Sequence, residues 1–128
     1  REPNKRSETN NAHTNKYSHK IWQRYASPVW FDIRQTNTLN YKIGKDDKDE
    51  RHICALQLQV IARCLELWTN ENETVLSPFA GVGSEGYVAL QMKRKFIGME
   101  LKPSYYTTAV KNLKAAEGQF SIKGLIYD

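Results

Sequence analysis

The stretch that decides the fold is VLSPFAGVGS, residues 75–84. A short β-branched and apolar run, Thr74-Val75-Leu76, leads into it, and the proline and two glycines then interrupt both strand and helix patterns. Gly81 and Gly83 allow the backbone to approach a ligand closely, and a helix that begins at Ser84 presents free amide groups at the same place. The stretch therefore predicts a strand, a glycine turn and a helix.

The residues after this turn continue the same pattern. The helix that begins at Ser84 is expected to run to about Lys93. Phe96-Ile97-Gly98-Met99-Glu100 is typical of a buried strand with an acid at its end. Pro103 suits the first turn of a further helix, whose apolar face we expect to contain Tyr106, Ala109, Val110 and Leu113. This order of elements is the opening of an α/β nucleotide-type fold.

The part before the turn divides into a polar arm and a more apolar remainder. Residues 1–20 contain only Ala12 and Tyr17 from the apolar set, so we expect this arm to be mobile. Residues 21–50, interrupted by Pro28, are expected to form an irregular connecting segment. Residues 51–128 then form the α/β portion. It opens with a helix whose buried face has Ile61, Cys64, Leu65 and Trp68, and its tail, residues 118–128, alternates weakly as a strand does.

Composition sets limits on the partners and on the cellular setting. The formal charge of +5 suits a partner with phosphates, although such an excess is weak evidence on its own. The sequence contains no run of about 18 apolar residues, which excludes a predicted membrane span. Cys54 and Cys64 fall in one predicted helical region without the spacing of metal ligands. We therefore expect reduced thiols, a cytoplasmic location, no membrane partner and no metal site.

The glycine turn and the acid after the second strand together predict a pocket for a nucleoside-containing cofactor. The Glu100 carboxylate is placed to accept hydrogen bonds from a ribose diol. With Gly86, the turn also matches G-x-G-x-x-G, so the glycine pattern alone leaves a dinucleotide-binding oxidoreductase fragment open. A basic nucleic-acid-binding module that needs no cofactor is the second alternative.

The residues around the turn resemble one known family. VLSPFAGVGS is similar to the D-P-F-x-G-x-G-T/S motif of DNA methyltransferases that modify exocyclic amines, and residues 96–106 are similar to that family's F-I-G-I-E-L-x-P-x-Y. Residues 51–64 resemble its K-H-P-x-Q-x-P…I-x-R-C segment, which precedes the cofactor motif in the circularly ordered subgroup. The resemblance covers roughly residues 50–115, and the family is found in restriction-modification systems and in phage and prophage genomes.

The resemblance implies S-adenosylmethionine as the cofactor, DNA as a partner and a partial Rossmann-like methyltransferase fold with an incomplete sheet. It implies that residues in three places hold the cofactor, namely Arg51, His52, Ile53, Cys54, Ser77, Pro78, Phe79, Gly81, Gly83, Ser84 and Glu100. Ser77 stands where the family usually has Asp, and Ile53 and Gln57 replace prolines of the family pattern. The implied reaction is methyl transfer to N6 of adenine or N4 of cytosine.

The family's catalytic tetrad, an Asp, Asn or Ser followed by Pro-Pro and an aromatic residue, has no match here. The chain has no Pro-Pro pair, and Ser27-Pro28-Val29-Trp30 is the nearest approach to the pattern. A target-recognition region does not fit between Trp30 and His52. We therefore expect no catalytic residue in this chain and a tetrad on a missing N-terminal part, with that part or a second copy of the chain completing the sheet.

Four smaller expectations concern side chains outside the turn. Trp22, Trp30 and Phe31 are expected to pack rather than to stack on a base, and Asp32 is expected to pair with Arg34. The basic run Lys93-Arg94-Lys95 is expected to be a solvated turn. Of Tyr105 and Tyr106, one is expected in the core and the other near the cofactor's adenine.

Overall fold

The computed structural model describes residues 16–40, 42 and 55–126. It contains helices on one side of a small parallel sheet, in the order α1 (Lys16–Tyr25), α2 (Leu58–Trp68), β1 (Thr74–Ser77), α3 (Ser84–Gln91), β2 (Lys95–Gly98) and α4 (Pro103–Ile126). The predicted strand, turn, helix, strand and helix are therefore all present in the predicted order. Met99 and Glu100 lie just beyond β2 rather than inside it.

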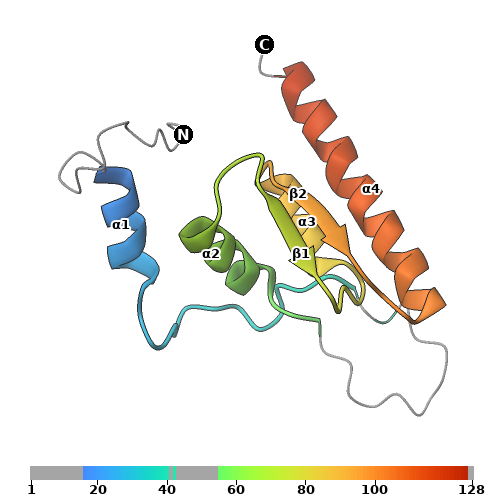
Figure 1. Ribbon diagram of the computed structural model, residues 1–128, viewed down its shortest axis with the longest axis horizontal. Helices are drawn as coiled ribbons and strands as arrows, with labels where there is room; N and C mark the ends of the chain where they lie inside the picture. Colours follow the sequence, from blue (N-terminus) through green and yellow to red (C-terminus); the bar gives the residue numbers. More distant parts are fainter. Residues whose placement is uncertain (1–15, 41, 43–54, 127–128) are drawn as a thin grey trace.

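The two strands pair in parallel, and α3 is the crossover between them. Their register places Val75 opposite Phe96 and Leu76 opposite Ile97. Val75 and Phe96 pack toward α2 and α3. In Figure 1, α3 lies behind the strands and α2 lies beside β1. Leu76 and Ile97 point to the other face, where they are 59% and 55% exposed, because successive strand residues alternate between faces.

The hydrophobic core lies between α2 and α3. Ile61 and Leu65 of α2 contact Val88 and Ala89 of α3, and Val75 and Phe96 add to this cluster from the sheet. The predicted buried face of α2 is thus confirmed at two positions. Cys64 is exposed, and Trp68 is 70% exposed with the ring of Trp22 against it at a centroid distance of 5.8 Å.

The predicted apolar face of α4 is confirmed at Ala109 and is wrong at Tyr106. Thr108, Ala109 and Ala116 are buried, whereas Tyr106 is 58% exposed. The predicted strand in the tail was also wrong, because α4 continues to Ile126. Extending a helix adds one hydrogen bond for each residue that is ordered, whereas a strand needs a neighbouring edge with which to pair.

The N-terminal region contains a helix that the sequence patterns did not predict. Ile21–Tyr25, expected to be irregular, belongs to α1, together with the last five residues of the expected arm. Tyr17, Ile21 and Tyr25 are spaced at i, i+4 and i+8, are partly buried and lie on the side of α1 that packs on α2. The boundaries at residues 20 and 50 stay predictions, and residues 1–15 lie outside the described part.

Arg94 has a structural role that differs from the predicted solvated turn. Its side chain is 8% exposed and donates hydrogen bonds to Thr69 Oγ1 at 3.0 Å, to the Thr69 carbonyl at 2.9 Å and to the Met92 carbonyl at 2.5 Å. Thr69 follows the last residue of α2, so Arg94 ties the end of that helix to the start of β2. Lys93 and Lys95 are exposed, as predicted.

Close packing at Gly86 gives a test of the fold. A Cβ at this position would lie 2.5 Å from Leu113 Cδ2 and from Phe96 Cδ1, so Gly86→Ala should lower the free energy of unfolding by about 1–3 kcal/mol through overpacking. At Gly118, also in a helix, a Cβ meets nothing within 4 Å. Gly118→Ala should therefore stabilise the chain by about 0.5–1 kcal/mol. Urea denaturation of both variants measures the difference, and equal midpoints would contradict the packing.

Candidate functional site

The glycine bend, residues Ser77–Ser84, lies against the residues that follow β2. The Met99 amide donates to the Ser77 carbonyl at 2.9 Å, and the Ala80 amide donates to the Met99 carbonyl at 2.8 Å. Because β1 and β2 are parallel, their carboxyl ends meet at one edge of the sheet. The bend and the acid are thus brought together by the strand register.

Glu100 is hydrogen-bonded directly to this bend. Its Oε2 accepts from the Gly81 amide at 2.8 Å, and its Oε1 accepts from the Lys102 amide at 2.9 Å. The predicted proximity of the turn and the acid is therefore found in the structure. A carboxylate has about four acceptor positions, so two remain for a ligand's hydroxyl groups.

Two glycines in the bend have positive φ but different surroundings. Gly81 has φ 54°, and a Cβ built on it meets nothing within 4 Å. Gly83 has φ 85°, and its Cβ would lie 3.1 Å from Ala109 Cβ in α4. The Asn112 side-chain amide of α4 also donates to the Val82 carbonyl at 2.8 Å. Gly81 thus faces open space, while Gly83 lies on the side that packs against α4.

Two large apolar side chains stand exposed beside Glu100 and the bend. Phe79 is 86% exposed and Leu101 is 100% exposed. Leu101 is a candidate residue that the sequence reasoning missed. Its signal was an apolar residue directly after the acid and just before Pro103, a position at which a strand has ended and an apolar side chain has no sheet to cover. Exposed apolar side chains beside polar groups are typical of ligand sites.

The other predicted cofactor residues fall into three groups. Ser77 and Ser84 are in the bend but buried, at 8% and 4% exposure, and Pro78 is exposed beside Phe79. Arg51, His52, Ile53 and Cys54 lie outside the described residues, so the structure does not place them. The role of all these residues in holding a cofactor stays a prediction.

The tyrosine pair at the start of α4 differs from expectation. Neither ring is buried, because Tyr106 is 58% exposed and Tyr105 is partly buried with the Lys102 ammonium 4.5 Å from its ring centroid. The expected core tyrosine is therefore absent from this pair. The large apolar residue on the buried side of α4 is Leu113, which lies beside Gly86.

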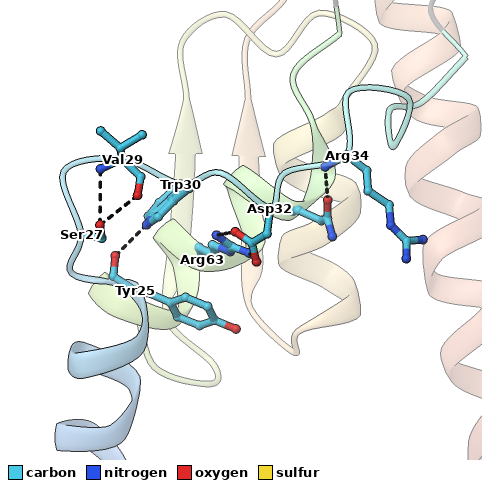
Figure 2. Close-up of polar contacts among 8 residues, drawn as sticks. Tyr25, Ser27, Val29, Trp30, Asp32, Arg34 and Arg63 are labelled. Carbon is cyan, nitrogen blue, oxygen red and sulfur yellow. Dashed lines mark hydrogen bonds and ion pairs between the residues drawn. The ribbon is translucent and has the colours of Figure 1, made fainter.

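The Ser27-Pro28-Val29-Trp30 segment, the nearest approach to a tetrad, forms a local turn (Figure 2). The Ser27 hydroxyl donates to the Val29 carbonyl at 2.8 Å, and the Trp30 indole donates to the Tyr25 carbonyl at 2.9 Å. Both polar groups are therefore engaged by nearby backbone carbonyls, those of Val29 and Tyr25. Trp30 packs as predicted, but Phe31 is 94% exposed and does not.

Arg63 fastens this segment to α2. Its guanidinium donates to both Asp32 carboxylate oxygens, at 2.9 and 2.6 Å, and lies 5.0 Å from the Tyr25 ring centroid and 5.2 Å from that of Trp30. Figure 2 shows Arg63 from α2 reaching the carboxylate. The expected Asp32–Arg34 pair was wrong, because a guanidinium fork between two rings forms the better-aligned contact.

A concavity lies away from the glycine bend. It has a volume of about 410 Å³ and is lined by residues of α1, α2 and the Asp32 segment and by Met92. The lining residues include no member of the bend and neither Glu100 nor Leu101. Within the described ranges, no group of three His, Cys, Asp or Glu residues is placed to hold a metal ion. None of the described helices has the length and apolarity needed to cross a membrane.

A parallel strand–helix–strand unit with a glycine bend facing an acid defines the chain as an α/β protein with Rossmann-like topology. The family model described as DNA methylase, for N6 and N4 methyltransferases, matches residues 1–111. The chain belongs to this family. The match reaches well upstream of residue 50, where the motif resemblance begins, and it gives no support to an oxidoreductase or to a module without a cofactor.

Curated relatives agree with the family. The chain is 33% identical over 81 residues to the type II methyltransferase M.HindIII of Haemophilus influenzae, a match that covers 63% of this chain and 26% of that protein. It is 31% identical over 101 residues to the type II methyltransferase M.BglI of Bacillus subtilis, which covers 78% of this chain and again 26% of the relative. The chain thus spans about a quarter of the length of these relatives.

The solved structures confirm the fold. The chain is similar to a protein of Thermus thermophilus described as a DNA modification methylase, solved in complex with S-adenosyl-L-methionine, with a TM-score of 0.57 and 20% identity. The match covers 84% of this chain and 38% of that one. The predicted fold, a partial Rossmann-like α/β methyltransferase fold with an incomplete sheet, is confirmed by this likeness and by the two-stranded sheet of the described residues.

The Asp32–Arg63 pair predicts a pH dependence for the docking of the Trp30 segment. The Arg63 hydrogen bond holds the pKa of Asp32 below its ordinary value of 3.8. Because the folded-state pKa is depressed, the pair stabilises the docked segment above the ordinary pKa, and this contribution is lost as the pH falls through the lowered value. Trp30 fluorescence in a Trp22→Phe, Trp68→Phe background should therefore stay constant down to about pH 4 and change only below it.

Asp32→Asn is the control for this titration. It removes the titrating group, so the acid transition in Trp30 emission should disappear while far-UV circular dichroism reports whether the fold persists. A transition in Trp30 emission centred above the ordinary Asp32 pKa of 3.8, in the chain that keeps Asp32, would contradict the assigned pairing.

Proposed function

We propose that this chain supplies the S-adenosylmethionine-binding part of a DNA methyltransferase that acts on an exocyclic amine, N6 of adenine or N4 of cytosine. Family membership supports the reaction class. The observation that carries the assignment of the site is the hydrogen bond between the Gly81 amide in the bend and the Glu100 carboxylate.

The residues around this contact fit a nucleoside cofactor. The free acceptor positions of Glu100 are suited to the two ribose hydroxyls, and the open space over Gly81 leaves room for the ligand to approach the backbone. Phe79 and Leu101 offer apolar surface on which the cofactor's uncharged parts can pack. When bound, the cofactor supplies the methyl group on its sulfonium centre.

Other parts of the chain are proposed to bind the two ends of the cofactor. Arg51, His52, Ile53 and Cys54 are proposed to seat the methionine carboxylate, with Pro78, Gly83 and Ser84 completing the bend around the ligand. Ser77, where the family usually has Asp, brings a neutral hydroxyl in place of a carboxylate near the cofactor's ammonium group. We expect the affinity of this chain for the cofactor to be correspondingly reduced.

The remaining parts of the reaction are assigned outside this chain. Ser27 and Trp30 form hydrogen bonds to the nearby carbonyls of Val29 and Tyr25, which supports a packing role for the segment. The tetrad and the target-recognition region are proposed to lie in the rest of a longer protein, consistent with coverage of 26% of the relatives. DNA and that remaining part, or a second copy of the chain, are the proposed partners.

Replacement of Glu100 tests the cofactor site. Glu100→Gln loses the negative charge and should weaken binding of S-adenosylhomocysteine by about 10- to 100-fold, because a hydrogen bond to a charged group is worth about 1.5–3 kcal/mol. Isothermal titration calorimetry measures this change. The matched control is Glu117→Gln, which alters an exposed glutamate of α4 and should bind as the wild type does.

Two results of the titration would contradict the proposal. The first is Glu100→Gln binding S-adenosylhomocysteine with unchanged affinity. The second is wild-type chain that binds NADH and not S-adenosylhomocysteine, which would favour an oxidoreductase site.

Absence of the tetrad gives a second prediction. A methyl-transfer assay with labelled S-adenosylmethionine and duplex DNA should show no turnover by this chain alone, because it has no Pro-Pro tetrad to accept hydrogen bonds from the amine. Turnover that Ser27→Ala abolishes would instead place the catalytic residue in the Ser27–Trp30 turn.

A further inference from the structure

The solvent-facing side of α1 has an unbalanced set of positive charges. Lys16, Lys20 and Arg24, called here the α1 cation row, are spaced at i, i+4 and i+8 and are all exposed. We propose that the α1 cation row is a docking surface for the phosphate backbone of duplex DNA. The choice of partner rests on the proposed function, in which DNA is the substrate.

Packing fixes which side of α1 is available. Tyr17 and Tyr25 are partly buried toward α2, where the Tyr17 hydroxyl donates to Glu66 and the Tyr25 ring stacks on Arg63. The helix contacts α2 along this side, and Figure 1 shows α1 at the outer edge of the described molecule. Residues three and four apart share a helix face, so the α1 cation row lies together on the outward flank.

The helix gains no stability from these charges. α1 contains no acidic residue, so no carboxylate within it offsets the row. Like charges at i and i+4 destabilise a helix by about 0.2–0.5 kcal/mol per pair, and Lys16 at the first position opposes the helix dipole. Arg24 at the last turn is the one member of the row that the dipole favours. Charges that cost helix stability are better explained by an external anion.

The nearby carboxylates are already engaged. Asp32 pairs with Arg63 at 2.6 Å, and Glu66 accepts the Tyr17 hydroxyl. Arg24 lines the same concavity as these two acids and lies 5.3 Å from the Tyr25 ring centroid. Lys16 and Lys20 have no ion pair with any described residue. Arg24 also acts electrostatically on Asp32, so Lys16 and Lys20 are the members of the row most available to an external anion.

The spacing of the row suits a DNA strand. Eight residues of α-helix rise about 12 Å, with neighbouring members of the row about 5–6 Å apart at Cβ. One DNA strand carries a phosphate for about every 3.4 Å of axis, so the row spans three to four phosphates, at roughly 12 Å in all. Long, flexible lysine and arginine side chains adjust the remaining differences.

This surface is separate from the cofactor site. α2 lies between α1 and the sheet in Figure 1, and among the described helices and strands α1 contacts α2 alone. Neutralising the α1 cation row should therefore leave cofactor binding unchanged. The two proposals can be tested in the same protein and can fail independently.

The test compares two triple variants of the full chain with equal changes in net charge. The first replaces the row, Lys16→Gln, Lys20→Gln and Arg24→Gln, and the matched control replaces three exposed lysines elsewhere, Lys95→Gln, Lys111→Gln and Lys114→Gln. Fluorescence anisotropy with a labelled duplex of about 20 base pairs is measured over a series of KCl concentrations. Glutamine keeps helix propensity close to that of lysine and arginine, and circular dichroism verifies the helix content.

We expect the row variant to lose at least about tenfold in DNA affinity near 100 mM salt and to lower the slope of log K against log salt by about 2–3, since each phosphate contact contributes about 0.9. The control should keep the wild-type slope within about one contact. Equal losses in both variants, or no DNA binding by the wild type, would overturn the proposal.

Two further measurements separate the alternatives. One result would overturn DNA as the partner in favour of an anionic membrane surface. In that result the wild type binds phosphatidylserine vesicles but not DNA, and the row variant no longer binds the vesicles. Calorimetry with S-adenosylhomocysteine on the row variant should match the wild type. If the wild type binds DNA through the α1 cation row but does not bind S-adenosylhomocysteine, the cofactor proposal is contradicted and the DNA-docking proposal is retained.

Discussion

The parallel register of β1 and β2 is the constraint on which the site depends. It places Ser77 opposite Gly98, so the two strands end level with each other. The chain leaves β1 into the glycine bend and leaves β2 toward Glu100 at the same edge of the sheet. Without this register the Gly81 amide and the Glu100 carboxylate would not meet at 2.8 Å.

Close helix packing supports that register from behind. α3 reaches β2 and α4 because Gly86 has no side chain, and a Cβ there would collide with Phe96 and Leu113. Arg94 adds a second point of attachment, since its hydrogen bonds join the turn before β2 to Thr69 after α2. The strand–helix–strand unit is therefore held by close packing at Gly86 and by the buried guanidinium of Arg94.

Local patterns in the sequence were sufficient to predict the strands, the helices α2 and α3, and the proximity of the bend to Glu100. They failed where the deciding contact joins distant residues. Asp32 pairs with Arg63, 31 positions away, and no local pattern distinguishes that partner from Arg34. The apolar residues of α1 pack on a helix that begins more than thirty residues later, so the periodicity of α1 is weak in isolation. Leu101 was missed because its exposure depends on where β2 ends.

The small size of the buried core side chains limits how much the core stabilises the glycine bend. None of the large side chains in the described part is fully buried, and several of the buried core residues are alanine or valine. A core of this kind contributes less per residue than one filled by leucine and aromatic side chains, because hydrophobic stabilisation scales with the apolar area removed from water. The shape of the bend then relies more on its hydrogen bonds, from Gly81 to Glu100, from Ala80 to Met99 and from Asn112 to Val82. A ligand that binds only the folded bend stabilises the folded state in proportion to the logarithm of its concentration. In a chain with such a core, cofactor binding and folding are therefore thermodynamically coupled.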